Sequence, residues 1–132
     1  MTYALDTNIV SYILRSDLNV QAKLKAAKKR GDAVMIPPVV YYEIRRGFLR
    51  KSAPVKEKAF KLFCEENPVG EMNLEAWERA AFIYAQAART IDDADILIAA
   101  FCIAHGYTLV TNNERHFNVI GGLRIENWAA CT

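Results

Sequence analysis

Short apolar runs alternate with longer segments of helical periodicity along this chain of 132 residues. The runs are too short for helices, and each is followed by polar or turn-forming residues, so they predict buried strands. The expected strands are residues 3–5, 33–36, 69–72, 107–111 and 123–125. Strands that alternate with helices favour a parallel sheet covered on both faces. We therefore expect an α/β three-layer sandwich, a central and mostly parallel sheet flanked by helices, formed by residues 1–132 as one domain.

The helices are predicted from apolar side chains spaced three and four apart and from start and stop residues. The expected helices are residues 9–14, 17–30, 38–48, 55–66, 74–88 and 91–105. Thr90 and Asp93 resemble a capping box before the last of them. Trp77 and Tyr84 fall on an apolar stripe of the 74–88 helix, which assigns them to the core. Trp128 is expected to pack the C-terminal tail or a partner chain.

The composition excludes several classes of protein. Hydrophobic residues make up 52% and charged residues 24% of the chain, which is enough to form a core and argues against disorder. No apolar run approaches the roughly 20 residues that span a bilayer, and no basic segment precedes an apolar one as in a signal peptide. Cys64, Cys102 and Cys131 are odd in number and widely spaced, so we expect free thiols and a cytoplasmic location.

Charge is divided unevenly along the chain. Residues 1–61 carry 13 Lys and Arg against five Asp and Glu, whereas residues 62–132 carry four against ten. This division fits a surface that binds a polyanion, and it equally fits ordinary solvated helix faces.

Three acids stand at positions where a carboxylate is costly or conspicuous. Asp6 directly follows the first expected strand, and Glu43 lies on a helix among apolar neighbours. Asp95 begins the apolar stripe of the 91–105 helix. Each acid also has an ordinary explanation: Asp6 as a helix N-cap, Glu43 as the partner of Arg46, and Asp95 as a favourable charge near a helix N-terminus.

Together the three acids suggest a metal site, because hard cations such as Mg²⁺ and Mn²⁺ prefer carboxylate oxygens. Packed carboxylates repel each other, and a divalent cation relieves that repulsion. A bound cation also activates water for attack on a phosphodiester. We therefore expect Asp6, Glu43 and Asp95 to hold Mg²⁺ or Mn²⁺ for cleavage of RNA, with Lys and Arg side chains holding the backbone.

Four segments in this order resemble the PIN-domain ribonucleases, and most closely the VapC toxins of bacterial toxin–antitoxin pairs. The segments are Leu5-Asp6-Thr7-Asn8, the helix of Glu43 after Ile36-Pro37-Pro38, Asp95-Ile96-Leu97-Ile98-Ala99-Ala100, and Leu109-Val110-Thr111-Asn112-Asn113 followed by Phe117. The resemblance implies a metal-dependent endoribonuclease that uses Asp6, Glu43 and Asp95 as metal ligands. It also implies a homodimer and a VapB-type antitoxin whose tail blocks the acidic site.

The chain departs from this family after the Thr111 strand, where the family often has a fourth acid. Asn113 takes that place and is included among the expected catalytic residues, because an amide can orient water or offer an oxygen to metal. His116 stands where an acid often precedes the Phe, and Glu114 is a weak candidate to compensate. The departure puts a tight second metal site in doubt.

Other functions remain as alternatives. A catalytically weak PIN-like module that binds nucleic acid or protein would use the acids only as caps. An aspartate-nucleophile phosphatase would need a second acid two residues after Asp6, where the chain has Asn8. No phosphate-binding glycine loop, nucleophile elbow or zinc-protease motif is present. His105 and His116 are assigned structural or surface roles.

Overall fold

Four parallel strands form the sheet in the described part of the chain, residues 1–87 and 91–129 of a computed structural model. The strands are β1 (Thr2–Leu5), β2 (Ala33–Met35), β3 (Thr108–Val110) and β4 (Arg124–Glu126). Their order in the sheet is β2-β1-β3-β4, with Ala4 paired to Met35 on one side and to Leu109 on the other. The expected parallel α/β architecture is confirmed, and β1, the first strand of the chain, lies inside the sheet.

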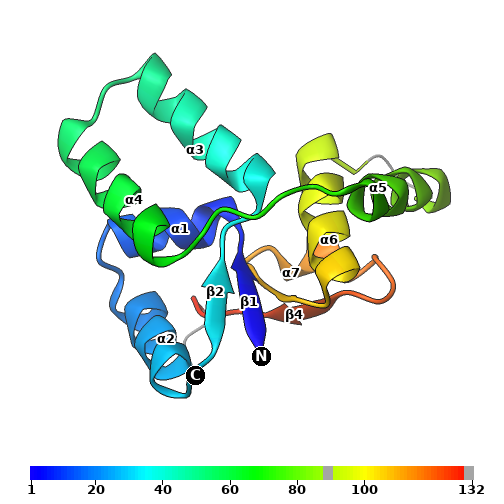
Figure 1. Ribbon diagram of the computed structural model, residues 1–132, viewed down its shortest axis with the longest axis horizontal. Coiled ribbons are helices and arrows are strands. Elements are labelled where there is room, and N and C mark those ends of the chain that lie inside the picture. The colour runs from blue at the N-terminus through cyan, green and yellow to red at the C-terminus, as the bar shows by residue number, and fades with distance from the viewer. Residues whose placement is uncertain (88–90, 130–132) are drawn as a thin grey trace.

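Helices cover this sheet on both sides (Figure 1). They are α1 (Thr7–Leu14), α2 (Leu18–Lys29), α3 (Pro38–Arg50), α4 (Pro54–Glu66), α5 (Leu74–Gln86), α6 (Asp93–His105) and α7 (Glu114–Phe117). In Figure 1, α1 to α4 lie to one side of the strands and α5 and α6 to the other, with α3 and α4 running as an antiparallel pair. No helix among the described residues is long and apolar enough to cross a bilayer.

Local sequence explains where these helices begin and end. Asp17 caps α2 by accepting a hydrogen bond from the backbone N–H of Val20, and Asn73 caps α5 in the same way. Proline opens α3 and α4, where its missing N–H costs nothing. Gly106 ends α6 in the left-handed conformation, with φ of 73°, which a residue without Cβ adopts freely.

The buried side chains of the described residues form one cluster around the sheet. Leu5 and Leu109 from the strands are fully buried, as are Ile9 from α1 and Phe117 from α7. Trp128 is 2% exposed and meets the ring of Tyr3 edge-on at 5.2 Å, so it packs the tail against β1, as predicted. The fixed core holds the carboxyl ends of β1 and β3, which carry polar residues, in a constant position.

Two sequence predictions were wrong. Residues 69–72 form no strand, and Val69 makes only a single bridge to Ile36 beyond β2. Trp77 and Tyr84 are 51% and 70% exposed and do not belong to the core. Residues 88–90, which hold the end of the expected 74–88 helix and Thr90 of the expected capping box, lie outside the described residues. Asp92 occupies the N-cap position of α6, without a side-chain capping bond.

Candidate metal and active site

Asp6 lies where β1 ends and α1 begins, at the carboxyl end of the sheet. Its backbone N–H donates to the carbonyl of Val110 at the end of β3, at 2.9 Å. Its side chain is the N-cap of α1, where Oδ1 accepts from the backbone N–H of Thr7 at 2.8 Å. The other oxygen, Oδ2, accepts from the Thr111 hydroxyl at 2.7 Å. Asp6 is therefore held at both oxygens, and its residue is only 7% exposed.

Glu43 reaches the same region from the first half of α3. Its Oε1 accepts from the hydroxyl of Thr7 at 2.7 Å, which ties it to the residue next to Asp6. Its Oε2 lies 3.6 Å from Arg46 Nη2, so the pair with Arg46 considered from the sequence is also present. The position of Glu43 is therefore compatible with both interpretations, as a metal ligand and as the partner of Arg46.

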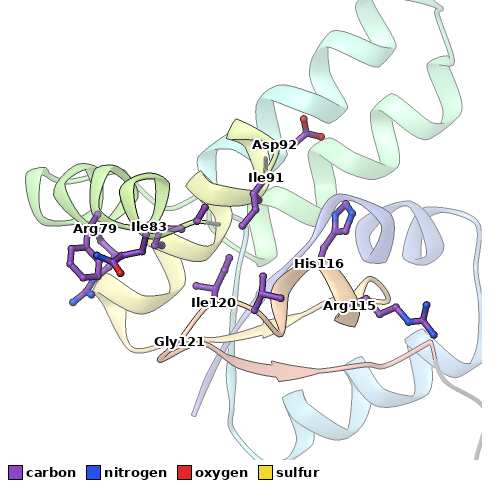
Figure 2. Close-up of a pocket in the computed structure, with 12 residues that line it drawn as sticks. Arg79, Ile83, Ile91, Asp92, Arg115, His116, Ile120 and Gly121 are labelled. Carbon is purple, nitrogen blue, oxygen red and sulfur yellow. The ribbon is translucent and has the colours of Figure 1, made fainter. Parts of the chain in front are cut away.

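Asp95 enters from the first turn of α6. Its Oδ2 lies 3.0 Å from Nδ1 of His116 on α7. In Figure 2 the imidazole of His116 points from α7 toward the part of the chain that carries Asp92, at the beginning of α6. Asp92 and Asp93 are exposed, as expected for residues at a helix start, whereas Asp95 is half-buried.

Electrostatic effects connect the three acids. Burial raises the pKa of Asp6 above 3.8, and the negative charges of Asp95 and Glu43 raise it further. The hydrogen bonds from Thr111 and Thr7 oppose this by stabilising the ionised carboxylate. Cys102 of α6 lies in the core beside this group, and burial together with the charge of Asp6 raises the pKa of its thiol. The ionised form of Asp6 is thus destabilised both by dry surroundings and by two neighbouring acids.

The donor set suits a hard divalent cation, although the acids do not form a closed cluster. Among residues 1–87 and 91–129, no three His, Cys, Asp or Glu side chains are gathered closely enough to enclose an ion. Each acid instead holds a hydrogen-bonding partner of its own. Three carboxylates, one of them buried with a raised pKa, are the oxygen ligands that Mg²⁺ and Mn²⁺ prefer. A shared ion would require these side chains to move closer together.

The polar residues after β3 have different surroundings. The backbone N–H of Asn113 donates to Oγ1 of Thr111 at 3.0 Å, and the Thr111 hydroxyl donates to Asp6, so two hydrogen bonds link the Asn113 backbone to Asp6. Glu114 accepts from Asn127 at 3.1 Å, so the weak candidate for a compensating acid is engaged elsewhere. Asn112 donates to the hydroxyl of Tyr12 at 3.1 Å and joins the loop to α1.

Two cavities adjoin the acids. A groove of about 500 Å³ is lined by Thr7 and Glu43 and by the basic residues Arg15, Lys51 and Lys56. A second cavity of about 430 Å³ lies beyond His116 (Figure 2). It is lined by apolar Ile83, Ile91 and Ile120 and by polar Arg79, Asp92 and His116. Glu43 therefore lines a groove that carries basic residues, and His116, which contacts Asp95, lines a mainly apolar pocket.

Three residues make contacts at the site that the sequence predictions did not include. Thr7 and Thr111 belong to the segments that resemble the family, and the structure shows that they hold Asp6 and Glu43. His116 is on the surface, as expected, but it also contacts Asp95. The sequence signals for the threonines are that each adjoins a polar residue at a strand end and that each lies in a segment that resembles the family.

The fold and the site define an α/β protein with Asp6 at the carboxyl end of a parallel strand, the usual ligand position in such sheets, and with Glu43 and Asp95 close enough for their charges to raise its pKa. The family model of the PIN domain matches residues 3–123, and the chain belongs to that family.

Individual relatives agree with this family over nearly their whole length. The chain is 29% identical to ribonuclease VapC2 of Rickettsia felis, over 97% of this chain and 98% of the relative. It is 28% identical to the tRNA(fMet)-specific endonuclease VapC of Shigella flexneri, over 98% and 99%. Among solved structures, VapBC2 from Rickettsia felis bound to a promoter DNA fragment superposes with a TM-score of 0.89 at 26% identity, covering 97% of this chain and 99% of the other.

Proposed function

We propose that this chain is a metal-dependent endoribonuclease and the toxin of a toxin–antitoxin pair, with Asp6, Glu43 and Asp95 as its metal ligands. The observation that carries the proposal is the state of Asp6, a buried carboxylate whose pKa is raised by burial and by two nearby acids. A divalent cation bound among them relieves this repulsion. The ribonuclease relatives, which align over almost the whole chain, support the same activity.

The chain's residues would divide the work at this site. A bound Mg²⁺ or Mn²⁺ supplies a water of lowered pKa and stabilises the leaving oxygen of a phosphodiester. Thr111 and Thr7 keep both oxygens of Asp6 in fixed directions, and Thr7 also fixes Glu43. Asn113, whose backbone is linked to Asp6 through Thr111, would offer an uncharged side-chain amide, which suits orientation of water or substrate better than tight metal binding.

The basic groove beside Glu43 is where we propose that the RNA backbone lies. Arg15, Lys51 and Lys56 line it and supply positive charge within the same cavity that includes the acid. Such side chains bind phosphates without regard to sequence. The three acids by themselves would repel the phosphates of RNA. The positive side chains of the groove offset this repulsion and hold the RNA backbone next to the metal site. Free Cys64 and Cys102 agree with action in the reducing cytoplasm.

We propose two protein partners. One is a VapB-type antitoxin, which the similarity to the Rickettsia felis VapBC2 structure supports, and we propose that its tail covers the acidic site. A second copy of the chain is suggested by α5, which exposes Leu74, Trp77, Ala81 and Tyr84 in a single row along the helix. A row with this three- and four-residue spacing is the seam by which two helices pack together.

Cleavage of a structured RNA tests the activity directly. We expect wild-type protein to cut it in Mg²⁺, EDTA to stop the cut, and Asp6→Asn to lower the rate by at least about 10²-fold, because metal catalysis contributes several kcal/mol. Asp17→Asn is the matched control, since Asp17 is also a helix N-cap and asparagine caps equally well. Equal rates for wild type and Asp6→Asn would exclude the proposed site.

A binding module without catalysis is the second candidate. Its support is that each acid already has a hydrogen-bonding partner and that Asn113 carries no charge. Calorimetric titration with Mn²⁺ separates the two functions. If the chain is a nuclease, the wild type binds Mn²⁺ at a site that Asp95→Asn loses. If it is only a binding module, the wild type and Asp95→Asn give the same heats.

A further inference from the structure

His116 brings a nitrogen donor to the proposed metal site. Its Nδ1 lies 3.0 Å from Oδ2 of Asp95, while the ring as a whole is largely open to solvent. The next residue, Phe117, is completely buried and anchors the short helix α7 in the core. The backbone that carries His116 is thus fixed while its imidazole remains accessible at the mouth of the cavity in Figure 2.

We propose that His116 is a ligand of the same cation as Asp95, and that it shifts the preference of the site from Mg²⁺ toward first-row transition ions such as Mn²⁺ and Co²⁺. The inference rests on the proposed function, because it takes the acids as metal ligands. It assigns a fourth protein ligand at a position with no carboxylate.

The observed geometry fits two ligands of one ion. Donors at adjacent corners of an octahedron, each about 2.1 Å from the metal, lie about 3.0 Å apart. The separation between Nδ1 and Asp95 Oδ2 is the same. The tautomer that carries its proton on Nε2 leaves the Nδ1 lone pair free to bind. The chain therefore needs no backbone movement to present both atoms to one cation.

The chemistry of the donor decides the preference. Mg²⁺ binds through carboxylates, phosphates and water, whereas imidazole is a favourable ligand for transition ions. Asn113 and Glu114 do not restore the missing charge, since Asn113 is neutral and Glu114 is bonded to Asn127. A site with one nitrogen and three carboxylates is more selective against Mg²⁺ than a site made only of oxygen.

An ordinary surface pair is the competing explanation of the same contact. An exposed His–Asp pair contributes little to stability and would be indifferent to the identity of the metal. The two explanations differ in one observable, which is whether the imidazole nitrogen is bonded to the ion.

Pulsed electron paramagnetic resonance of the full chain loaded with one equivalent of Mn²⁺ measures that bond through the coupling of ¹⁴N to the electron spin. We expect imidazole ¹⁴N modulation in the wild type and its loss in His116→Ala. His105→Ala is the matched control, because His105 lies at the other end of α6 with its Nδ1 on the carbonyl of Phe101. That variant should keep the modulation.

Competition between Mg²⁺ and bound Mn²⁺ gives a second readout. In His116→Asp, an all-oxygen site, Mg²⁺ should displace half of the Mn²⁺ at about tenfold lower excess than in the wild type. Bound Mn²⁺ that is lost in Asp6→Asn but shows no imidazole nitrogen would overturn this inference and leave the proposed nuclease intact. A wild type that binds no Mn²⁺ would overturn both.

Discussion

At the scale of single residues, Asp6 is the acid of the site whose ionisation lowers the stability of the folded protein. Its carboxylate is buried, and both burial and the nearby acids raise its pKa above 3.8. Between that value and the raised pKa, the folded protein keeps a proton that the unfolded chain has lost. The free energy of unfolding therefore falls as pH rises through this window, and it remains lowered at neutral pH. A carboxylate at the end of β1 therefore lowers the free energy of unfolding at neutral pH.

Asp6→Asn should consequently raise the melting temperature at pH 7 in EDTA, although it removes the activity. The amide keeps an oxygen for the Thr7 N–H and can donate to Thr111 Oγ1, so the local hydrogen bonds survive. The gain over wild type should shrink as pH is lowered toward 4, where the wild-type carboxyl takes up its proton. Scanning calorimetry at both pH values checks this.

Asp17→Asn again serves as the control, and its melting temperature should change little at either pH. A melting temperature of Asp6→Asn below that of the wild type at pH 7 would show that the carboxylate stabilises the fold. It would then act as a simple cap, and the repulsion on which the metal site depends would be absent.

At the scale of elements, the turn after α4 is restricted by close packing. Gly70 follows the bridge of Val69 to Ile36, and its backbone N–H donates to the carbonyl of Ile36 at 2.8 Å. A Cβ at this position would come within 2.6 Å of Cε1 of Phe101, whose ring is 1% exposed. The ring is enclosed on all sides and cannot move away without disturbing the core.

Gly70→Ala should therefore destabilise the protein by about 1–3 kcal/mol, the usual cost of overpacking a core. Gly47→Ala is the opposite case, because Gly47 lies within α3 with nothing within 4 Å of its Cβ direction. Alanine there should stabilise the helix by up to about 1 kcal/mol. Urea unfolding measures the free energy of unfolding of Gly70→Ala and Gly47→Ala. Equal free energies for the two variants would contradict the packing seen at Phe101.

The positions of the strand ends and of helix α5 show how much of the fold could be predicted from the sequence. Asp6 and the loop after β3 each directly follow an apolar run in the sequence, and the carboxyl ends of parallel strands lie at the same edge of a sheet, so their proximity can be predicted from the sequence. Helix α5 was misjudged because it has two apolar faces. Small Ala76 and Ala80, with Ile83, face the core, whereas the larger Trp77 and Tyr84 face solvent. Periodicity alone gives one stripe and does not say which face packs inside.

The hydrogen bonds of the two threonines to the acids could not be predicted from the sequence, because most of them join residues far apart in the chain. Thr7 and Glu43 are 36 residues apart, and Thr111 and Asp6 are 105 apart. Their pairing depends on the order of strands in the sheet and on the direction of α3. Residues 69–72 form no strand because their pairing is limited to one bridge, between Val69 and Ile36, and Ile36 already lies beyond the end of β2.

At the scale of the whole molecule, α5 presents an exposed apolar face. The exposed row of Leu74, Trp77, Ala81 and Tyr84 is a surface that a monomer would leave in water. We therefore predict that the wild type is a dimer and that Trp77→Glu combined with Tyr84→Glu makes it monomeric. Sedimentation equilibrium at several concentrations measures this.

Leu18→Glu is the matched control, since Leu18 is 82% exposed but lies on α2, away from α5. It should remain a dimer. A double variant on α5 that sediments with the same mass as the wild type would contradict the assignment of this face to a second copy.

The central claim for the whole molecule is that folding gathers Asp6, Glu43 and Asp95 around one cation. Anomalous diffraction from crystals of the wild-type protein soaked in Mn²⁺ tests it most directly. We predict one strong peak among the three side chains, with carboxylate oxygens about 2.0–2.3 Å from the ion or joined to it through one water. An absent peak, with the acids still held by Thr7, Thr111 and His116, would contradict the account.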